Sequence, residues 1–170
     1  MKHTNRLTFK KAEKEDIQTL FSIFDSQQNL EQDDVVFKKV NISEIEALVN
    51  LQEENPKFRI RLVYMNDMKK AIGYFHFFEQ VPDNESVFIS MLLIEKQFQK
   101  QKLGQEIFDS FQKELQENGQ FKRIVLKVSS LNINALQFWV KQGFTHIQEI
   151  KIRGLEERNQ CDLILYKYIK

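Results

Sequence analysis

The chain has 170 residues, 42% of them hydrophobic and 29% charged, with a formal net charge of +1. This size suits a single domain over residues 1–170 with a core that needs neither disulfides nor metal, and the charge excludes a global field that would recruit nucleic acid or a membrane surface. Cys161 is the only cysteine, which excludes an internal disulfide, and no stretch approaches the ~20 apolar residues of a membrane span. We therefore expect a cytoplasmic protein without metal.

After a short strand, the first half of the chain has helical periodicity and then changes to the period of strands. Apolar residues at helical spacing predict two amphipathic helices, separated by a polar, acidic loop, and the second helix ends before Pro56. Strand 87–94, the last of this half, is apolar throughout, so we expect it to be buried on both faces. The expected elements are strand 7–12, helix 13–24, loop 25–34, helix 42–55 and strands 58–64, 71–78 and 87–94.

The second half alternates helices and strands. A helix begins at Leu103 and ends near residues 118–119, and Asn132 and Gly143 are the expected N-cap and C-terminal stop of the next helix. The unit 87–128 needs a parallel crossover. We expect one mixed α/β sheet flanked by helices on both faces. The remaining elements are strand 121–128, helix 132–142 and strands at about 144–153 and 161–169.

Gly104 is an unexpected residue for the first turn of a helix, where glycine costs roughly 1 kcal/mol relative to alanine. The amides of that turn have no partners within the helix, and the helix dipole places partial positive charge there. Lys96, Lys100 and Lys102 add cations at the same end. This arrangement indicates an anion site, in which glycine leaves room for close approach, although a solvated basic loop is an equal alternative on this stretch alone.

Two longer segments decide between these alternatives. "ISMLLIEKQFQKQKLGQEIF" and "VLKVSSLNINALQFWVKQGF" resemble the two core motifs of the GNAT superfamily of acyl-CoA-dependent N-acyltransferases. Two positions depart from those motifs: Lys102 replaces a glycine, at a cost of roughly 1–2 kcal/mol if the backbone is left-handed, and Trp139 replaces a tyrosine that serves many members as general acid. The matching residues are Leu92, Ile94, Phe98, Gln99, Leu103, Gly104, Val128, Asn132, Ala135, Gly143 and Phe144.

The resemblance implies acetyl-CoA as co-substrate and direct attack of an amine on its thioester. It places the backbone N–H of Ile94 at the developing oxyanion. The proton that the departing thiolate takes up could come from Ser129, Ser130 or water. The coenzyme-binding residues that it implies are Leu92, Leu93, Ile94, Gln99, Lys100, Gln101, Lys102, Leu103, Gly104, Gln105, Asn132, Ala135 and Trp139.

The general base must be a titratable side chain within reach of the acceptor amine. Glu79 and Glu85 are the catalytic candidates near the third and fourth strands, whereas His76, inside an apolar strand, is more simply a hydrogen-bonded core histidine. The acidic loop 29–34, with Glu31, Asp33 and Asp34, would suit a cationic acceptor or is plain solvated surface.

The leading hypothesis is an N-acetyltransferase acting on a small-molecule amine or a protein amino group, as a monomer or homodimer. One rival is a non-catalytic acyl-CoA-binding or regulatory domain of the same fold, which Lys102, Trp139 and the absence of a carboxylate from strand 87–94 favour. A nucleic-acid-binding module built on Arg59, Arg61 and the lysines is disfavoured by the near-zero net charge.

Overall fold

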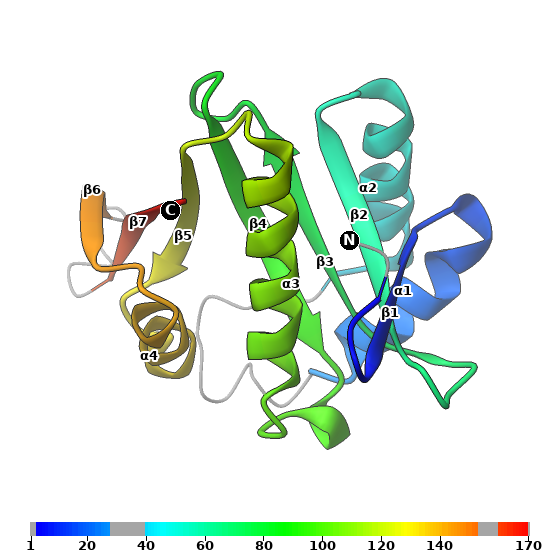
Figure 1. Ribbon diagram of the computed structural model, residues 1–170. Coiled ribbons are helices and arrows are strands. Elements are labelled where there is room, and N and C mark those ends of the chain that lie inside the picture. Colours follow the sequence, from blue (N-terminus) through cyan, green and yellow to red (C-terminus); the bar gives the residue numbers. More distant parts are fainter. Residues whose placement is uncertain (1–2, 28–39, 153–159, 170) are drawn as a thin grey trace.

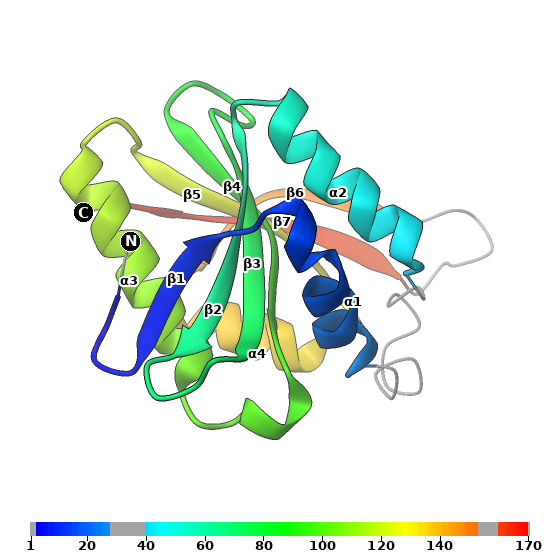
Figure 2. The same ribbon diagram turned by 90° about the vertical axis from the view of Figure 1, so that its right-hand side faces the viewer.

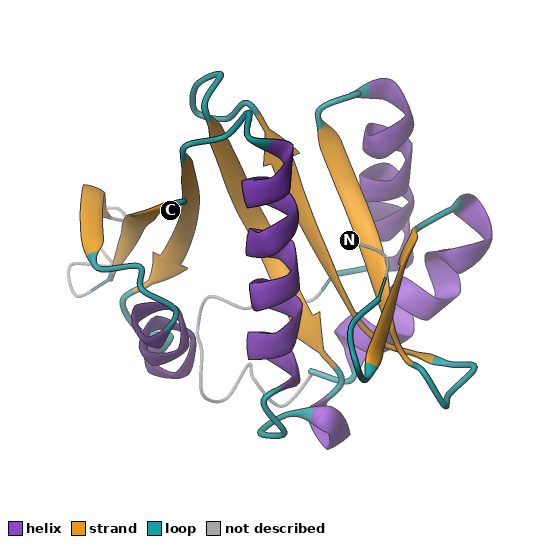
Figure 3. Ribbon diagram, in the orientation of Figure 1, coloured by secondary structure: helices purple, strands orange, loops and turns teal. Residues whose placement is uncertain are grey.

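The computed structural model describes residues 3–27, 40–152 and 160–169. These residues form a seven-stranded sheet in the order β1-β2-β3-β4-β5-β7-β6, with α1 and α2 on one face and α3 and α4 on the other (Figures 1 and 2). The bounds, coloured by type in Figure 3, are β1 Leu7–Lys11, η1 Lys14–Asp16, α1 Ile17–Asp25, α2 Ile42–Glu54, β2 Phe58–Met65, β3 Ala71–Glu79, β4 Ser86–Ile94, η3 Lys96–Phe98, α3 Leu103–Asn118, β5 Arg123–Ser129, α4 Ile133–Lys141, β6 His146–Ile152 and β7 Cys161–Tyr168.

The predicted mixed sheet with helices on both faces is confirmed. β4 and β5 run parallel and are joined by α3, as the crossover required, while the other neighbouring strands pair antiparallel. The short η3 turn was not predicted, because three residues are too few to show a periodic pattern. Within the described ranges, no helix is both long and apolar enough to cross a bilayer.

Two hydrophobic clusters hold the helices to the sheet, one on each face. Phe75 and Phe77 of β3 contact Phe111 of α3, with ring centroids 5.4 and 4.7 Å apart, on the face covered by α3 and α4. Phe58 and Tyr74 belong to the cluster under α1 and α2. Since successive strand residues point to opposite faces, the near-continuous apolar sequence of β3 fits a strand covered on both sides.

β4 departs from the prediction that it is buried throughout. Ser90 is exposed, and Met91 and Leu92 are only half-buried, although Val87 and Leu93 are buried as expected. A bulge explains the exposure: Met91 lies opposite His76 and Ile89 opposite Phe77, so Ser90 is an extra residue on β4. Beyond this bulge β4 no longer pairs with β5.

Candidate coenzyme site

The central feature of the site is an unpaired strand edge in the middle of the sheet. β4 pairs with β5 only from Ser86 to Ile89, which lie opposite Arg123 to Leu126. β4 then continues to Ile94, while β5 pairs on its other side with β7, and the two strands diverge (Figure 1). Among the described residues, this edge of β4 from residue 90 to residue 94 has no neighbouring strand, so its outward-facing N–H groups can pair with a ligand that has its own amide groups.

The orientation of these backbone groups follows from the ladder between β3 and β4. The N–H of Glu95 donates to the carbonyl of Ile72 at 2.8 Å. Because hydrogen-bonding residues alternate along an antiparallel strand, the N–H groups of Ile94 and Leu92 point away from β3, toward the open edge. The N–H of Leu93 points toward β3, and its side chain belongs to the cluster under α1 and α2. Of the three residues expected to bind coenzyme here, Leu93 therefore has its backbone turned away from the open edge.

The loop after β4 brings the predicted lysines together at the start of α3. Lys100 and Lys102 have left-handed backbones, with φ of 60° and 62°, so the condition under which Lys102 carries a conformational cost is met. Lys96, Lys100 and Lys102 are exposed, and none of the three forms an ion pair with another described residue. Three exposed ammonium groups within seven residues make this loop a strongly cationic surface.

The N-terminus of α3 carries unpaired amides at the same place. Lys102, the N-cap residue, makes no capping hydrogen bond with its side chain, and the first helical bond runs from the N–H of Glu106 to the carbonyl of Lys102 at 3.1 Å. The N–H groups of Leu103, Gly104 and Gln105 precede that bond and have no acceptor within the helix. An anion at this end would meet both the amides and the lysines.

Gly104 faces α4 rather than open solvent. A Cβ built on it would lie 3.4 Å from Cε2 of Phe138 and 3.7 Å from Cδ1 of Ile94, and its φ is not positive. A methyl group would thus make nearly ordinary contacts, whereas a longer side chain would extend between α3 and α4. Bulky side chains are therefore excluded at this position, as expected, whereas alanine would be accommodated.

Asn132 and Ala135 are linked by a helix cap. The Asn132 side chain accepts a hydrogen bond of 2.9 Å from the N–H of Ala135, as predicted, and α4 ends before Gly143, whose φ is 91°. This gives Asn132 a structural role as N-cap.

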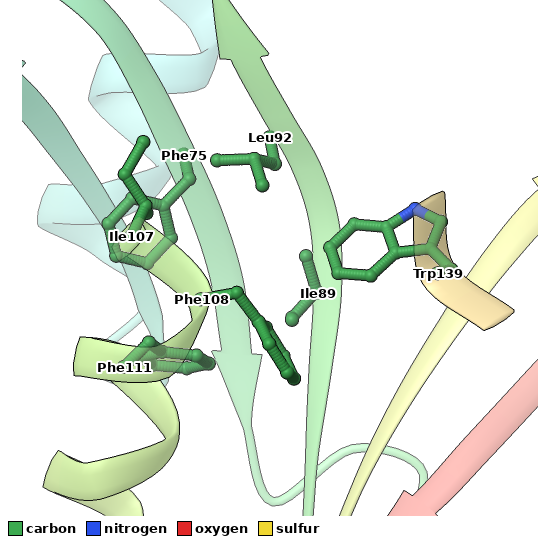
Figure 4. A pocket seen from close by; sticks show the side chains of 7 residues that line it. All are labelled: Phe75, Ile89, Leu92, Ile107, Phe108, Phe111 and Trp139. Carbon is green, nitrogen blue, oxygen red and sulfur yellow. The ribbon is translucent and has the colours of Figure 1, made fainter. Parts of the chain in front are cut away.

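Trp139 is buried in an aromatic cluster between α4 and α3. Its ring lies 5.7 Å from that of Phe108 and 5.3 Å from that of Phe144, edge to face. Figure 4 shows it lining a small apolar cavity of about 10 Å³ together with Ile89 and Leu92 of β4, which is about the size of one water molecule. Trp139 therefore packs as an apolar residue, with one side toward the open stretch of β4.

Glu79 and Glu85 are not brought to the open edge. Glu79 lies opposite Val87, at the start of β4, and is 3.6 Å from Arg59, while Glu85 forms an ion pair with Lys122. Both carboxylates therefore lie near the beginning of β4, and Ile94 is at its other end. At about 3.3 Å per residue, eight residues of strand separate these ends by roughly 26 Å. The prediction that Glu79 or Glu85 acts as the general base of a reaction at Ile94 does not fit this geometry.

His76 is buried, as expected, but one of its two ring nitrogens has no hydrogen-bond partner. Its Nδ1 has no partner, and its ring lies 5.3 Å from that of Phe58 and 6.1 Å from that of Tyr74. Burial lowers its pKa to about 4. The expectation of a hydrogen-bonded histidine is therefore wrong for Nδ1. The acidic residues Glu31, Asp33 and Asp34 lie outside the described residues.

Sequence reasoning missed three buried polar residues close to the opening. Gln27 is 1% exposed, Glu95 3% and Asp162 8%. Glu95 forms a 2.7 Å ion pair with Lys70, and Asp162 lies opposite Ser129, the last residue of β5. The only sequence signal was the carboxylate of Asp162 within an apolar strand. Gln27 and Glu95 stand beside polar loop residues and give no such signal.

Together, an open strand edge and an adjoining cationic helix start form a site for an extended ligand with amide groups and an anionic end. The sequence model of the acetyltransferase (GNAT) domain family matches residues 25–155. The chain belongs to the GNAT acetyltransferase family. No curated relative matches it by sequence.

Solved structures show the same fold at low identity. An acetyltransferase from Thermus thermophilus superposes with a TM-score of 0.79 at 19% identity, covering 98% of this chain and 99% of that one. The spermidine N-acetyltransferase of Vibrio cholerae, in complex with CoA and spermine, gives 0.74 at 16% identity, with 98% and 97% covered. The ribosomal-protein-S18-alanine N-acetyltransferase of Escherichia coli gives 0.69 at 15% identity, with 96% and 94% covered. The whole chain therefore has the fold of these acetyltransferases.

Proposed function

We propose that this protein, a single domain over residues 1–170, transfers an acetyl group from acetyl-CoA to a primary amine by direct attack of the neutral amine on the thioester. The observation that carries the proposal is the continuity between the open edge of β4 and the cationic start of α3. Coenzyme A combines an amide-containing pantetheine arm with a pyrophosphate, and the two parts of the site match these two chemistries.

The coenzyme would lie along the opening, with its pyrophosphate over the N–H groups of Leu103 to Gln105 and the exposed lysines. Its pantetheine arm would pair with β4. The N–H groups of Ile94 and Leu92 are then the available donors for the thioester carbonyl as it becomes an oxyanion. Removal of one such donor costs about 2.7–4 kcal/mol in other enzymes, so this would be a major contribution to catalysis.

The departure of the thiolate needs less stabilisation by the protein than the oxyanion does. A thiol with a pKa near 8.5 leaves as thiolate at neutral pH with a penalty of roughly 1.4–3 kcal/mol. Trp139, which has no acidic proton to give, is therefore compatible with turnover, and water at the opening or the hydroxyl of Ser129 or Ser130 can supply the proton.

The acceptor is proposed from the chemistry of similar folds. One structural neighbour is named for spermidine and another for the alanine of a ribosomal protein. Both substrates present a primary amine, which supports a small-molecule amine or a protein amino group in a cytoplasmic setting. The binding-only alternative of the same fold is favoured by Trp139 and by the distance of Glu79 and Glu85 from Ile94.

Thermal melting with and without acetyl-CoA, on the wild type and Gly104→Glu, tests the proposal. At a hundred times its dissociation constant, acetyl-CoA should stabilise the wild type by about 2.7 kcal/mol. Gly104→Glu adds bulk and negative charge between α3 and α4, beside the first amides of α3, so it should melt at the same temperature with and without the coenzyme. Absence of a shift in the wild type would refute the coenzyme site.

Release of the CoA thiol in a panel of amines then separates enzyme from binder. The panel includes spermidine and peptides that begin with alanine or serine. An enzyme releases thiol with at least one amine faster than in the absence of acceptor. Coenzyme binding with no release in any mixture would support the binding-only alternative.

A further inference from the structure

A buried glutamine joins the end of α1 to the end of β4. Gln27, 1% exposed, donates from Nε2 to the carbonyl of Ile94 at 3.0 Å and to Oγ of Ser26 at 2.9 Å. Gln99 donates from its own Nε2 to the same Ile94 carbonyl at 2.8 Å and to Oε1 of Gln27 at 2.9 Å. Two carboxamides thus converge on one backbone oxygen and on each other, and we call them the glutamine pair.

The Ile94 carbonyl needs such partners because of its place in the sheet. It points to the same side as the Ile94 N–H, away from β3, at the edge where β5 has already diverged. A buried carbonyl without a partner would carry the cost of its lost hydration. The glutamine pair supplies two donors where a neighbouring strand would have supplied one.

The same contacts set the position of residues 95–102, which we call the lysine loop, relative to β4. Gln99 stands directly before Lys100 and Lys102, the two left-handed residues that lead into α3. Its bonds to Ile94 and Gln27 therefore fix the start of that loop against the end of the strand. The two ends of the coenzyme site, the β4 amides and the α3 amides, are joined through this loop.

We propose that Gln27 is a positioning residue of the coenzyme site. It holds Gln99 and the Ile94 peptide so that the β4 amides and the α3 N-terminus keep the spacing that acetyl-CoA needs. This inference rests on the proposed function. Gln27 lies two residues after the end of α1, the helix on the opposite face of the sheet from α3, so it also couples that face to the lysine loop.

The first test compares Gln27→Met with Gln52→Met in calorimetric titrations with acetyl-CoA. Methionine has a similar shape but provides no N–H donor. Gln52 is a matched control because it is also buried, at 6% exposure. It bridges Ala12 and Ile60 through two hydrogen bonds of 2.8 and 2.7 Å, away from the lysine loop. Gln27→Met should weaken acetyl-CoA binding about tenfold, the effect of a net loss of roughly one hydrogen bond. Gln52→Met should bind as the wild type does.

The variant Gln27→Glu adds a pH signature that a simple packing defect lacks. As a carboxylate it accepts from Gln99 but cannot donate to Ile94, so affinity should be low at pH 8. Because Gln27 is buried, a carboxyl at this position takes up a proton well above its ordinary pKa of about 4.3. Lowering the pH to 6 should therefore restore an O–H donor, and the affinity relative to the wild type should recover. A ratio that is constant between these two pH values would contradict the proposal.

A double-mutant cycle with Gln99→Met tests whether the pair acts as a unit. If each single variant loses tenfold, independent residues would give about a hundredfold loss together, whereas a coupled pair gives about tenfold. Wild-type affinity in Gln27→Met, or an equal loss in Gln52→Met, would overturn the inference.

Hydrogen exchange of the free protein separates this inference from the proposed function. Gln27→Met should speed amide exchange over residues 95–104 by about tenfold, and Gln52→Met should leave that region unchanged. If the wild type does not bind acetyl-CoA at all, the proposed function is wrong, and exchange alone decides whether Gln27 fixes the loop. Unchanged exchange in Gln27→Met would overturn the positioning role.

Discussion

Gly73 of β3 lies against the carbonyl oxygen of Leu93 on β4, and a Cβ on Gly73 would be 2.4 Å from that oxygen. This distance is far below van der Waals contact, and the obstructing atom is backbone, so the two strands would have to move apart. We predict that Gly73→Ala lowers the free energy of unfolding by about 1–3 kcal/mol, as other overpacking substitutions do. Denaturant unfolding of the two proteins measures the difference.

Gly104→Ala is the control for Gly73→Ala. Its Cβ would meet Phe138 at 3.4 Å, close to an ordinary contact, and alanine improves helix propensity by up to about 1 kcal/mol. Its unfolding free energy should therefore stay within about 1 kcal/mol of the wild type. Equal losses in the two alanine variants would show that the contact with Leu93 is not the cause.

Lys102 adopts a left-handed backbone, with φ 62°, in which a side chain costs about 1–2 kcal/mol. We predict that Lys102→Gly raises the melting temperature of the free protein. Lys96→Gly is the control, because Lys96 lies in the η3 turn without a positive φ, and it should not stabilise. Lys102→Gly also removes a cation, so its affinity for acetyl-CoA should be lower and less sensitive to salt.

His76 should make the protein less stable in mild acid. Burial lowers its pKa in the folded state to about 4, whereas the unfolded chain has the ordinary value of 6.5. Between these values the unfolded state binds more protons, so stability from this group is complete above pH 6.5 and decreases as the pH falls toward 4, by roughly 3 kcal/mol in total.

His76→Leu tests this prediction, since it removes the titrating group and its unpaired Nδ1. Urea unfolding at pH 7, 6 and 5 should show the leucine variant losing less stability than the wild type over that range. Parallel losses in the two proteins would contradict the assigned cause.

Trp139 is the single tryptophan of the chain and lines the cavity beside Leu92. We predict that acetyl-CoA changes the intrinsic tryptophan fluorescence, because the proposed pantetheine arm would lie along β4 next to the indole. In Trp139→Phe the signal should vanish while calorimetry still detects binding. Binding by the wild type without any fluorescence change would place the ligand away from Trp139.

The order of elements and the family motifs were predictable because they depend on local patterns. Helical and strand periodicities, the cap formed by Asn132 and the stop at Gly143 each involve residues a few positions apart, and the structure confirms them. The left-handed backbone at Lys102 was also predictable, since the motif has glycine at that position.

Which of these residues meet depends on long-range packing. Glu79 and Glu85 are near Ile94 in sequence, but an extended strand carries them to its far end. Gln27 and Ile94 are 67 positions apart, yet they are hydrogen-bonded because α1 ends over the end of β4. Periodicity reports how a residue is buried, whereas sheet order, register and the bulge at Ser90 determine its neighbours. Local patterns were therefore sufficient for the fold and the family, while the open edge of β4 and its glutamine pair exist only once the strands and helices have packed.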